Sequence, residues 1–169
     1  MNFNDQVSST SKFVYMKALL EEMNVLMIGN NPLELAKVFN FLKSLPEKKV
    51  ITEIAFDLKS GLQRLSKFNP NFIILDDNLG RRELTHAVGS LSHFKKTKNI
   101  PVTVLKNSNY HEAFGGLAMN YILKENLSEQ SLYAAFRSSL ISARAQLYLK
   151  KVYKKRKGQL KRLLPVKFH

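Results

Sequence analysis

Cysteine is absent from this 169-residue chain. Without a thiol the protein can form no disulfide scaffold, no thiolate metal site and no cysteine nucleophile. Long apolar runs are missing as well, and no stretch reaches the ~18 uncharged residues that a membrane-spanning helix needs. Near the start, Lys17, Glu21 and Glu22 interrupt the apolar residues, so we expect no signal peptide there. We therefore expect a soluble, cytoplasmic protein.

Acidic residues are scarce, and their distribution is uneven. The chain has 27 Lys and Arg against 13 Asp and Glu, which gives a formal net charge of +14. Residues 144–169 carry ten of the basic side chains and no acidic one, so the other 143 residues hold 17 basic against 13 acidic, net +4. The high charge therefore belongs to a basic tail, and residues before it form an ordinary globular body.

Short apolar segments alternate with helical patterns along that body. Four of the apolar segments are continuous, as in strands covered on both faces, and the second alternates, as at a sheet edge. The expected strands lie at 25–28, 50–56, 72–75, 102–105 and 121–123. Repeated strand–helix alternation predicts an α/β three-layer sandwich, a five-stranded parallel sheet with helices on both faces.

Five helices are expected between and after these strands. Asn31 before a proline, Asp57, and Ser128 with Gln130 and Ser131 are N-terminal capping signals. A fourth, glycine-weakened helix is expected over 110–117. The inward stripes are Leu35, Val38, Phe39 and Leu42; Leu58, Leu62 and Leu65; Leu84, Val88, Leu91 and Phe94; and Leu132, Phe136 and Leu140 with Ile141.

Polar residues follow the ends of the strands. Parallel sheets place their functional sites at the carboxyl ends of the strands, so these residues should meet at one edge. They are Gly29, Asn30 and Asn31 after the first strand, Asp76, Asp77 and Asn78 after the third, Lys106 after the fourth and Lys124 after the fifth.

Four segments appear in a characteristic order: Asn31-Pro32, residues 69–76 ending in Asp76, residues 100–105, and Tyr121 to Lys124. Together they resemble the CheY-like receiver domains of bacterial two-component response regulators, over roughly residues 24–143. The resemblance implies a flavodoxin/CheY-like fold and phosphorelay signal transduction. It makes Asp76 the counterpart of the aspartate that a histidine kinase phosphorylates, and Lys124 the lysine that pairs with the phosphoryl oxygens. Asn78 would lend a carbonyl to the metal, and Tyr121 would be the rotameric switch.

Two departures from the family pattern indicate a degenerate site. Gly29 and Asn30 stand where the family has the acidic pair that holds Mg²⁺, and Lys106 replaces a Thr or Ser. We expect Asp77 to point away, which leaves Asp76 and Lys124 with a net charge of 0, or +1 where Lys106 also points inward. Such a site would bind no metal, because Mg²⁺ needs carboxylates. We expect Lys106 to replace the metal as the counter-charge of Asp76.

Other interpretations of these residues stay open. Asp76 and Lys124 could persist as a structural ion pair only, Tyr121 could be a packing residue, and the Lys106 ammonium could extend into solvent. Alternatively the chain is a phosphorylatable regulator that accepts a phosphoryl group on Asp76 and uses Mg²⁺ through Asp76 and Asn78. No glycine-rich phosphate loop, histidine metal motif or Ser-His-Asp arrangement supports an enzyme or a small-molecule substrate.

The two ends extend beyond the family's domain. Residues 1–23 form an N-terminal extension with a short helix expected over 11–22. At the other end, Leu140, Ala143, Leu147 and Val152 extend the apolar stripe into the tail over 144–169, where Gly158 weakens the helix. The tail could pack on a second copy in a homodimer, bind nucleic-acid phosphates, or bind an anionic membrane. Its basic cluster is Lys150, Lys151, Lys154, Lys155, Arg156 and Lys157.

The function that follows is a stand-alone, atypical receiver that acts by protein–protein interaction. Its expected partner is a histidine kinase or another regulator, contacted through a surface that includes Tyr121 and residues near Tyr110 and Leu132. A nucleic-acid-binding protein that uses the basic tail is the alternative of a different class.

Overall fold

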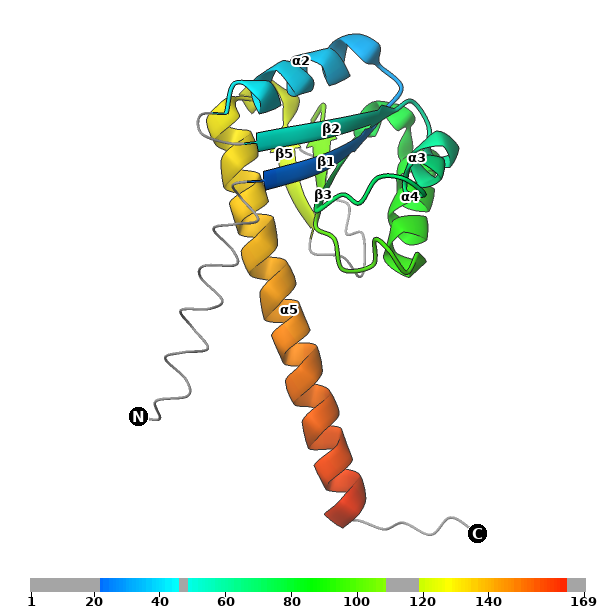
Figure 1. Cartoon of the computed structure of the whole chain (residues 1–169), viewed down its shortest axis with the longest axis vertical. Coiled ribbons are helices and arrows are strands. Elements are labelled where there is room, and N and C mark those ends of the chain that lie inside the picture. Colours follow the sequence, from blue (N-terminus) through cyan, green and yellow to red (C-terminus); the bar gives the residue numbers. More distant parts are fainter. Residues whose placement is uncertain (1–21, 46–48, 109–118, 164–169) are drawn as a thin grey trace.

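The computed structural model describes residues 22–45, 49–108 and 119–163. Its centre is a five-stranded parallel sheet with the order β2-β1-β3-β4-β5 (Figure 1). The predicted edge position of the second strand is thereby confirmed. The strands are β1 (Glu22–Ile28), β2 (Lys49–Ala55), β3 (Phe72–Asp76), β4 (Val102–Lys106) and β5 (Met119–Leu123).

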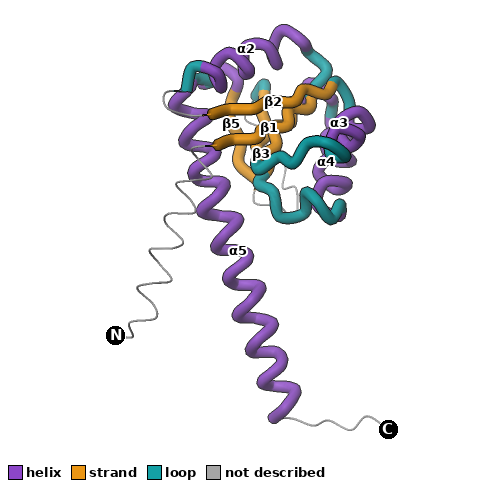
Figure 2. The backbone as a smooth tube through the Cα atoms, viewed as in Figure 1, coloured by secondary structure: helices purple, strands orange, loops and turns teal. Residues whose placement is uncertain are grey.

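Helices cover both faces of the sheet, which confirms the predicted three-layer sandwich (Figure 2). One hydrophobic cluster joins the sheet to α2 and α5, and a second joins it to α3 and α4. The helices are α2 (Pro32–Lys43), α3 (Leu58–Arg64), α4 (Arg81–His93) and α5 (Glu129–Leu163), and the 3-10 turns are η1 (Asp77–Leu79) and η2 (Lys124–Asn126).

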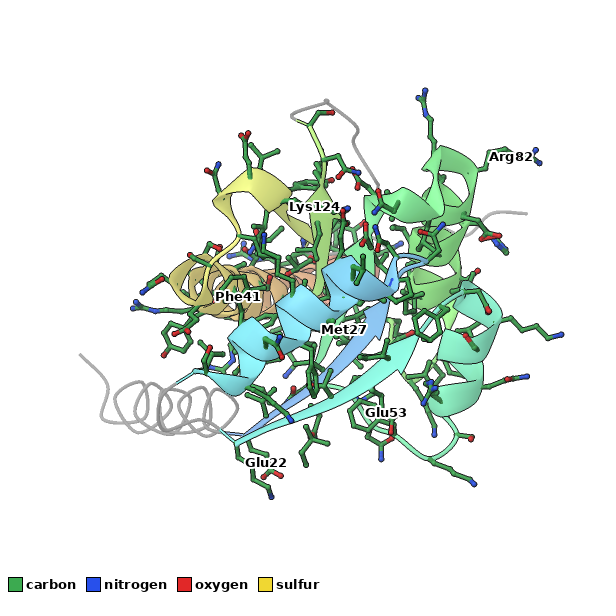
Figure 3. The ribbon with its side chains drawn as sticks, turned by 90° about the horizontal axis from the view of Figure 1, so that it is seen from above. Glu22, Met27, Phe41, Glu53, Arg82 and Lys124 are labelled. Carbon is green, nitrogen blue, oxygen red and sulfur yellow. The ribbon has the colours of Figure 1, made fainter. Side chains whose placement is uncertain are left out.

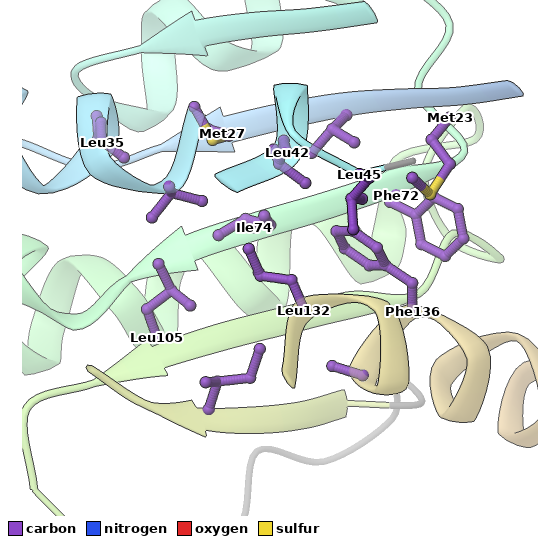
Figure 4. Packing of buried hydrophobic residues seen from close by; sticks show 14 of the residues in the cluster. Met23, Met27, Leu35, Leu42, Leu45, Phe72, Ile74, Leu105, Leu132 and Phe136 are labelled. Atoms are coloured by element: carbon purple, nitrogen blue, oxygen red, sulfur yellow. The ribbon is translucent and has the colours of Figure 1, made fainter. Parts of the chain in front are cut away.

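Successive side chains of the central strands point alternately into these two clusters. In β1, Val25 and Met27 face α2 and α5, whereas Leu26 and Ile28 face α3 and α4, as the two-residue period of a strand requires. On the α2 and α5 side, the rings of Phe72 and Phe136 are 4.6 Å apart between centroids (Figure 4). The hydrophobic core therefore sits equally on both faces of the sheet.

Side-chain caps fix where the helices begin. Oδ1 of Asn31 accepts hydrogen bonds from the backbone N–H groups of Leu33 (3.1 Å) and Glu34, with a proline at the first helical position. Asp57 accepts from the N–H of Ser60 at 2.7 Å, and this backbone hydrogen bond lowers the pKa of Asp57. Ser128 and Ser131 exchange hydrogen bonds at the start of α5. The predicted capping positions are confirmed.

Replacing Asn31 by alanine should cost about 1 kcal/mol of the free energy of unfolding, because two N–H groups of α2 lose their acceptor. Urea denaturation of both proteins measures the loss. Asn40→Ala, an exposed position inside the same helix, is the matched control and should leave stability unchanged or slightly raised. Equal losses at the two positions would refute the capping role.

Three expectations need correction. Phe94 lies just past the end of α4 and is 41% exposed, because the backbone turns extended there. Ile141 is 50% exposed, since one helical step past Leu140 rotates a side chain by about 100° away from the core. Glu22 belongs to β1, where it pairs in register with Lys49, so the first strand begins before residue 24. The rest of the helix expected over 11–22, and the helix expected over 110–117, fall outside the described residues.

The last helix confirms the predicted extension. α5 is 35 residues long, about 52 Å at 1.5 Å per residue, and passes Gly158 without interruption. Its first part packs on β5, β4 and α2. The remainder leaves the body of the protein as a single projecting helix (Figure 1).

Candidate functional site

The candidate site lies at the carboxyl ends of the strands, where the sequence predicted it. Asp76 ends β3, Lys106 ends β4, and Lys124 begins η2 directly after β5. The side chain of Lys124 is only 13% exposed, and Figure 3 shows it among the side chains that crowd this edge of the sheet. Strand β1 contributes the turn of Gly29 and Asn30, which leads into α2.

Lys124 is the centre of an acidic cluster. Its Nζ lies 2.6 Å from Oδ1 of Asp76 and 3.2 Å from Oδ1 of Asp77, and it also forms an ion pair with Oε2 of Glu34. Glu34 lies in the first turn of α2, which the Asn31 cap holds against this edge. Three carboxylates therefore share one ammonium group, whereas the sequence predicted a single carboxylate and a net charge of 0 to +1. The charge prediction omitted Glu34 and Asp77.

Burial and pairing act in opposite directions on the central ion pair. Burial raises the pKa of Asp76, and the hydrogen bonds from Lys124 and Asn78 do not cancel that effect. For Lys124, burial lowers the pKa, but the hydrogen bonds and charges of its carboxylate neighbours outweigh burial and leave the pKa raised. Asp76 is fully buried, and its Oδ2 has no hydrogen-bond partner among the residues that the structure describes. The pair is thus held in the charged form by mutual contact in a desolvated position.

The prediction that Asp77 points away from the site is wrong. Its Oδ1 is close to Lys124, and its carboxylate accepts two hydrogen bonds from Asn107, at 2.8 Å from the backbone N and 2.7 Å from Nδ2. The reason is local geometry: the 3-10 turn η1 begins at Asp77, so the alternation of a strand no longer applies.

Lys106 is not the counter-charge of Asp76. Its side chain is buried, which also excludes the interpretation that it extends into solvent, and its Nζ lies 3.9 Å from the ring centroid of Tyr121. The alternation of side chains along a strand explains this. In β4, Lys106 points to the same side as Val102 and Val104, toward α3 and α4. In β3, Asp76 points to the same side as Phe72 and Ile74, toward α2 and α5. A cation over an aromatic face is stabilised electrostatically.

The same alternation of side chains explains on which side of the sheet Tyr121 lies. It lies opposite Val104 in the β4–β5 register and therefore on the face of Lys106, with 40% of its surface exposed. Asp76 and Lys124, the two predicted charged partners, do meet, and Lys106 with Tyr121 forms a separate contact on the other face of the sheet.

Gly29 lets the end of β1 approach β3 closely. A Cβ atom at this position would lie 2.5 Å from Cβ of Asp76 and 3.2 Å from Cδ2 of Leu35. The first of these contacts is shorter than real Cβ atoms show, and the second is tighter than most. The carboxylate that the family places here therefore has no room without a shift of the backbone.

Asn78 connects the parts of the site. Its backbone N–H donates to Oδ1 of Asp76 (2.9 Å), and its Nδ2 donates to Oε2 of Glu34 (2.8 Å). The Nδ2 group of Asn30 donates to the backbone carbonyl of Asn78 at 2.8 Å, and Asn107 donates to its Oδ1 at 2.7 Å. Asn30 and Asn78 are thus part of one hydrogen-bond network, and Asn31 caps the helix α2 that carries Glu34.

The residues at this edge do not fit the Mg²⁺ ion that the family resemblance implies. The Asn78 carbonyl, one of the two predicted ligands, already accepts the amide N–H of Asn30, and Oδ1 of Asp76 is held by Lys124 and the N–H of Asn78. Amide and ammonium hydrogens repel a cation. Within residues 22–45, 49–108 and 119–163 no group of three or more His, Cys, Asp or Glu is placed to hold a metal ion.

The described part of the basic tail, residues 144–163, lies apart from this site. Its predicted cluster lies on the projecting part of α5 and is exposed to solvent: Lys150, Lys151, Lys154, Lys155, Arg156 and Lys157. None of the helices that the structure describes is long and apolar enough to cross a membrane.

Comparison with known proteins adds evidence on the fold. No family model and no curated protein matches the sequence. Among solved structures, the receiver domain of a sensor histidine kinase from Pseudomonas aeruginosa, solved with magnesium in its active-site cleft, superposes with a TM-score of 0.58 at 15% identity, covering 70% of this chain and 97% of that one.

Two further solved structures agree. The signal receiver domain of an HD domain-containing protein from Pseudomonas fluorescens has a TM-score of 0.59 at 16% identity and covers 73% of this chain and 98% of its own. A chemotaxis response regulator of Vibrio cholerae has a TM-score of 0.52 at 17% identity and covers 66% and 92%. The chain therefore has the fold of the receiver domains of response regulators.

Proposed function

We propose that this chain is a degenerate receiver in bacterial two-component signalling, which acts by binding another signalling protein rather than by metal-dependent phosphoryl transfer. The receiver fold and the Asp76–Lys124 pair at the ends of β3 and β5 support the signalling role. We assign this role to the cytoplasm, in keeping with the absence of cysteine.

The hydrogen bond from Asn30 to the Asn78 carbonyl carries the proposal. In a metal-binding receiver that carbonyl and a neighbouring carboxylate would face the cation together. Here the amide of Asn30 takes the place of the carboxylate, and its Nδ2 donates a hydrogen bond to the carbonyl at 2.8 Å. The position before it, Gly29, has no space for an acidic side chain. Both changes remove metal ligands, and the carboxylates that remain at this edge, Asp76, Asp77 and Glu34, are paired with the ammonium group of Lys124.

The binding surface that we propose includes Tyr121. Its ring lies on the edge strand β5, 40% exposed and in contact with Lys106, so it is accessible to a partner. Leu132 itself is fully buried, and only its neighbours on α5 are available to a partner. Tyr110 falls outside the described residues. A histidine kinase or another regulator is the proposed partner.

Nuclear magnetic resonance of the full chain tests the site directly. We expect addition of Mg²⁺ and beryllofluoride, a phosphoryl mimic, to leave the amide signals around Asp76, Lys106 and Lys124 unchanged. A site-wide change in the unmodified protein would contradict the proposal and would establish the alternative, a regulator phosphorylated on Asp76 with Mg²⁺.

A variant designed to bind Mg²⁺ gives a second test, in which a change of the spectrum is the expected result. Asn30→Asp removes the amide donor and supplies a carboxylate beside the Asn78 carbonyl, so Mg²⁺ should now shift the signals of Asn78 and Asp76. Asn40→Asp introduces the same charge at an exposed position on α2 and should show no such shift. If Asn30→Asp also stayed silent, the Asn30 amide would not be what excludes the metal.

A further inference from the structure

Along the projecting part of α5, lysines replace apolar residues on the side of the helix that faces the sheet nearer the body. Near the body, the buried residues Leu132, Phe136 and Leu140 face the sheet. Continued at helical spacing, the same side passes through Ala143 and Leu147 and then reaches Lys150 and Lys154. The expected apolar stripe from Leu140 therefore ends at Leu147, and Val152, five positions further, lies on another side of the helix.

A second apolar face begins where the first one ends. Positions 141, 145, 148, 149, 152 and 160 follow the helical period and form a stripe on the side opposite the core-facing residues, with Arg156 and Gln159 interrupting it between 152 and 160. Its large side chains face solvent although each is apolar over most of its surface. Their exposed fractions are 50% for Ile141, 64% for Tyr148, 64% for Leu149 and 60% for Leu160, with Val152 half-buried and Tyr153 at the margin, 65% exposed.

The rest of this segment is rich in basic residues, and Arg156 lies within the apolar stripe itself. Between residues 144 and 160 the chain has seven basic side chains and no acidic one, and Glu129 is the last acidic residue of the sequence. All the lysines of this segment are exposed. Nζ of Lys157 lies 5.9 Å from the ring centroid of Tyr153, at the boundary between the two faces.

A second copy of the helix is a poor partner for this segment. Two such helices could bring their apolar stripes together, but the flanking positions would be lysine on both sides, with no acid to pair with them. Arg156 would also fall within the shared apolar seam. Nucleic acid would satisfy the basic face and leave the leucines and tyrosines in water, because phosphate contacts need only positive charge.

An anionic bilayer suits both the apolar stripe and the lysine-rich sides, and Arg156 within the stripe can extend its guanidinium group to the lipid phosphates. A helix with a lysine-rich face and an opposite face of leucine, isoleucine and tyrosine lies in the plane of the interface, with the apolar residues in the acyl boundary. Lysine stems extend toward the lipid phosphates, and tyrosine rings favour the headgroup level. We propose that residues 141–160 of α5 bind the surface of an anionic lipid bilayer. This inference is independent of the proposed state of the Asp76 site.

Vesicle co-sedimentation of the full chain tests this binding. Vesicles of phosphatidylcholine with phosphatidylglycerol should bind the protein, and vesicles of phosphatidylcholine alone should bind it far less. Since each basic residue near an anionic surface contributes a factor of roughly five, the combined change Lys150→Gln, Lys151→Gln, Lys154→Gln and Lys155→Gln should lower the partition coefficient on the order of 100-fold or more.

Two further variants separate the mechanisms. Leu149→Ser with Leu160→Ser should weaken vesicle binding by roughly tenfold or more, because apolar burial is lost at unchanged charge. Four exposed lysines of the body provide the control with the same loss of charge, and their change to glutamine should have little effect: Lys59, Lys67, Lys95 and Lys98. Circular dichroism melting checks that every variant keeps the folded body.

Three results would overturn the proposal. One is failure of the unmodified chain to bind the anionic vesicles at low salt. Another is binding that the two serine changes do not weaken, which would mean charge attraction alone, as for nucleic acid. A third is a concentration-dependent dimer in light scattering that the serine changes dissociate, since the apolar face would then belong to a second copy.

Discussion

Replacing Lys124 by methionine should destabilise the protein by about 3 kcal/mol or more, the largest loss that we expect from any single charged residue. The change leaves Asp76 fully buried and Asp77 nearly so, beside Glu34, with no ammonium between them. Removing one partner of a buried pair leaves an uncompensated charge, which costs ~3 to 5 kcal/mol. Urea denaturation near neutral pH measures the difference.

The difference should depend on pH in a defined direction. The raised pKa of Lys124 means that its stabilisation is fully present below its ordinary value of 10.5 and is lost only as the pH rises through the higher value of the folded state. Burial raises the pKa of Asp76, so acidification protonates it more readily in the folded than in the unfolded chain. We therefore expect the destabilisation by Lys124→Met to shrink on acidification.

Lys49→Met is the matched control, since Lys49 forms an ion pair with Glu22 in which both side chains are more than half exposed. Solvent screens such a pair, and its loss should cost about 0.5 kcal/mol or less. If the two variants lost equal stability, Lys124 would not hold a desolvated cluster, and the account of the site given by its geometry would be wrong.

Replacing Phe136 by alanine should cost about 3 to 5 kcal/mol, because it opens a cavity between α5 and the sheet. Phe136 is fully buried, its ring lies against that of Phe72, and Leu132 and Leu140 flank it on the same helix face. The residue thus anchors the long helix to the body. Thermal or urea unfolding, followed by the loss of helical circular dichroism, measures the effect.

A change on the projecting part of the same helix provides the comparison. Leu149 is 64% exposed, so Leu149→Ala should change the free energy of unfolding by a few tenths of a kcal/mol at most. A loss at Leu149 as large as that at Phe136 would show that the projecting part contributes to the folded core, in conflict with its exposure.

The fold could be predicted because each element has a local signal. Asn31, Asp57 and Ser128 are caps whose side chains find acceptors or donors within three residues, and such contacts depend little on the rest of the chain. The continuous strands 72–76 and 102–106 are buried on both faces, and the alternating strand 49–55 lies at the edge. Strand period and flanking caps suffice to place them.

The candidate site could be predicted only in part. Asp76 and Lys124 meet because both end parallel strands on the same face of the sheet. Glu34 was missed because its contact with Lys124 depends on how α2 packs, although its place one turn after Asn31 was a usable signal. Lys106 was assigned to the wrong face of the sheet because it was placed by its match to the Thr or Ser of the family. The alternation of side chains along β4, which points it the other way, was not considered.

The two parts of α5 differ in the free energy of local unfolding, because the first part packs on the sheet and the second projects away from it. Residues 129–140 can unfold only by breaking the contacts of Phe136 and its neighbours, so their amide hydrogens exchange at a rate limited by unfolding of the body. Residues 150–160 project away from the described body, so their helix depends mainly on intrinsic propensity. That propensity is reduced by like charges at positions 150, 151, 154 and 155, which repel one another one turn apart. A single uninterrupted helix thus spans both extremes of the protein's local stability, and its far part is close to a helix–coil balance that external contacts can shift.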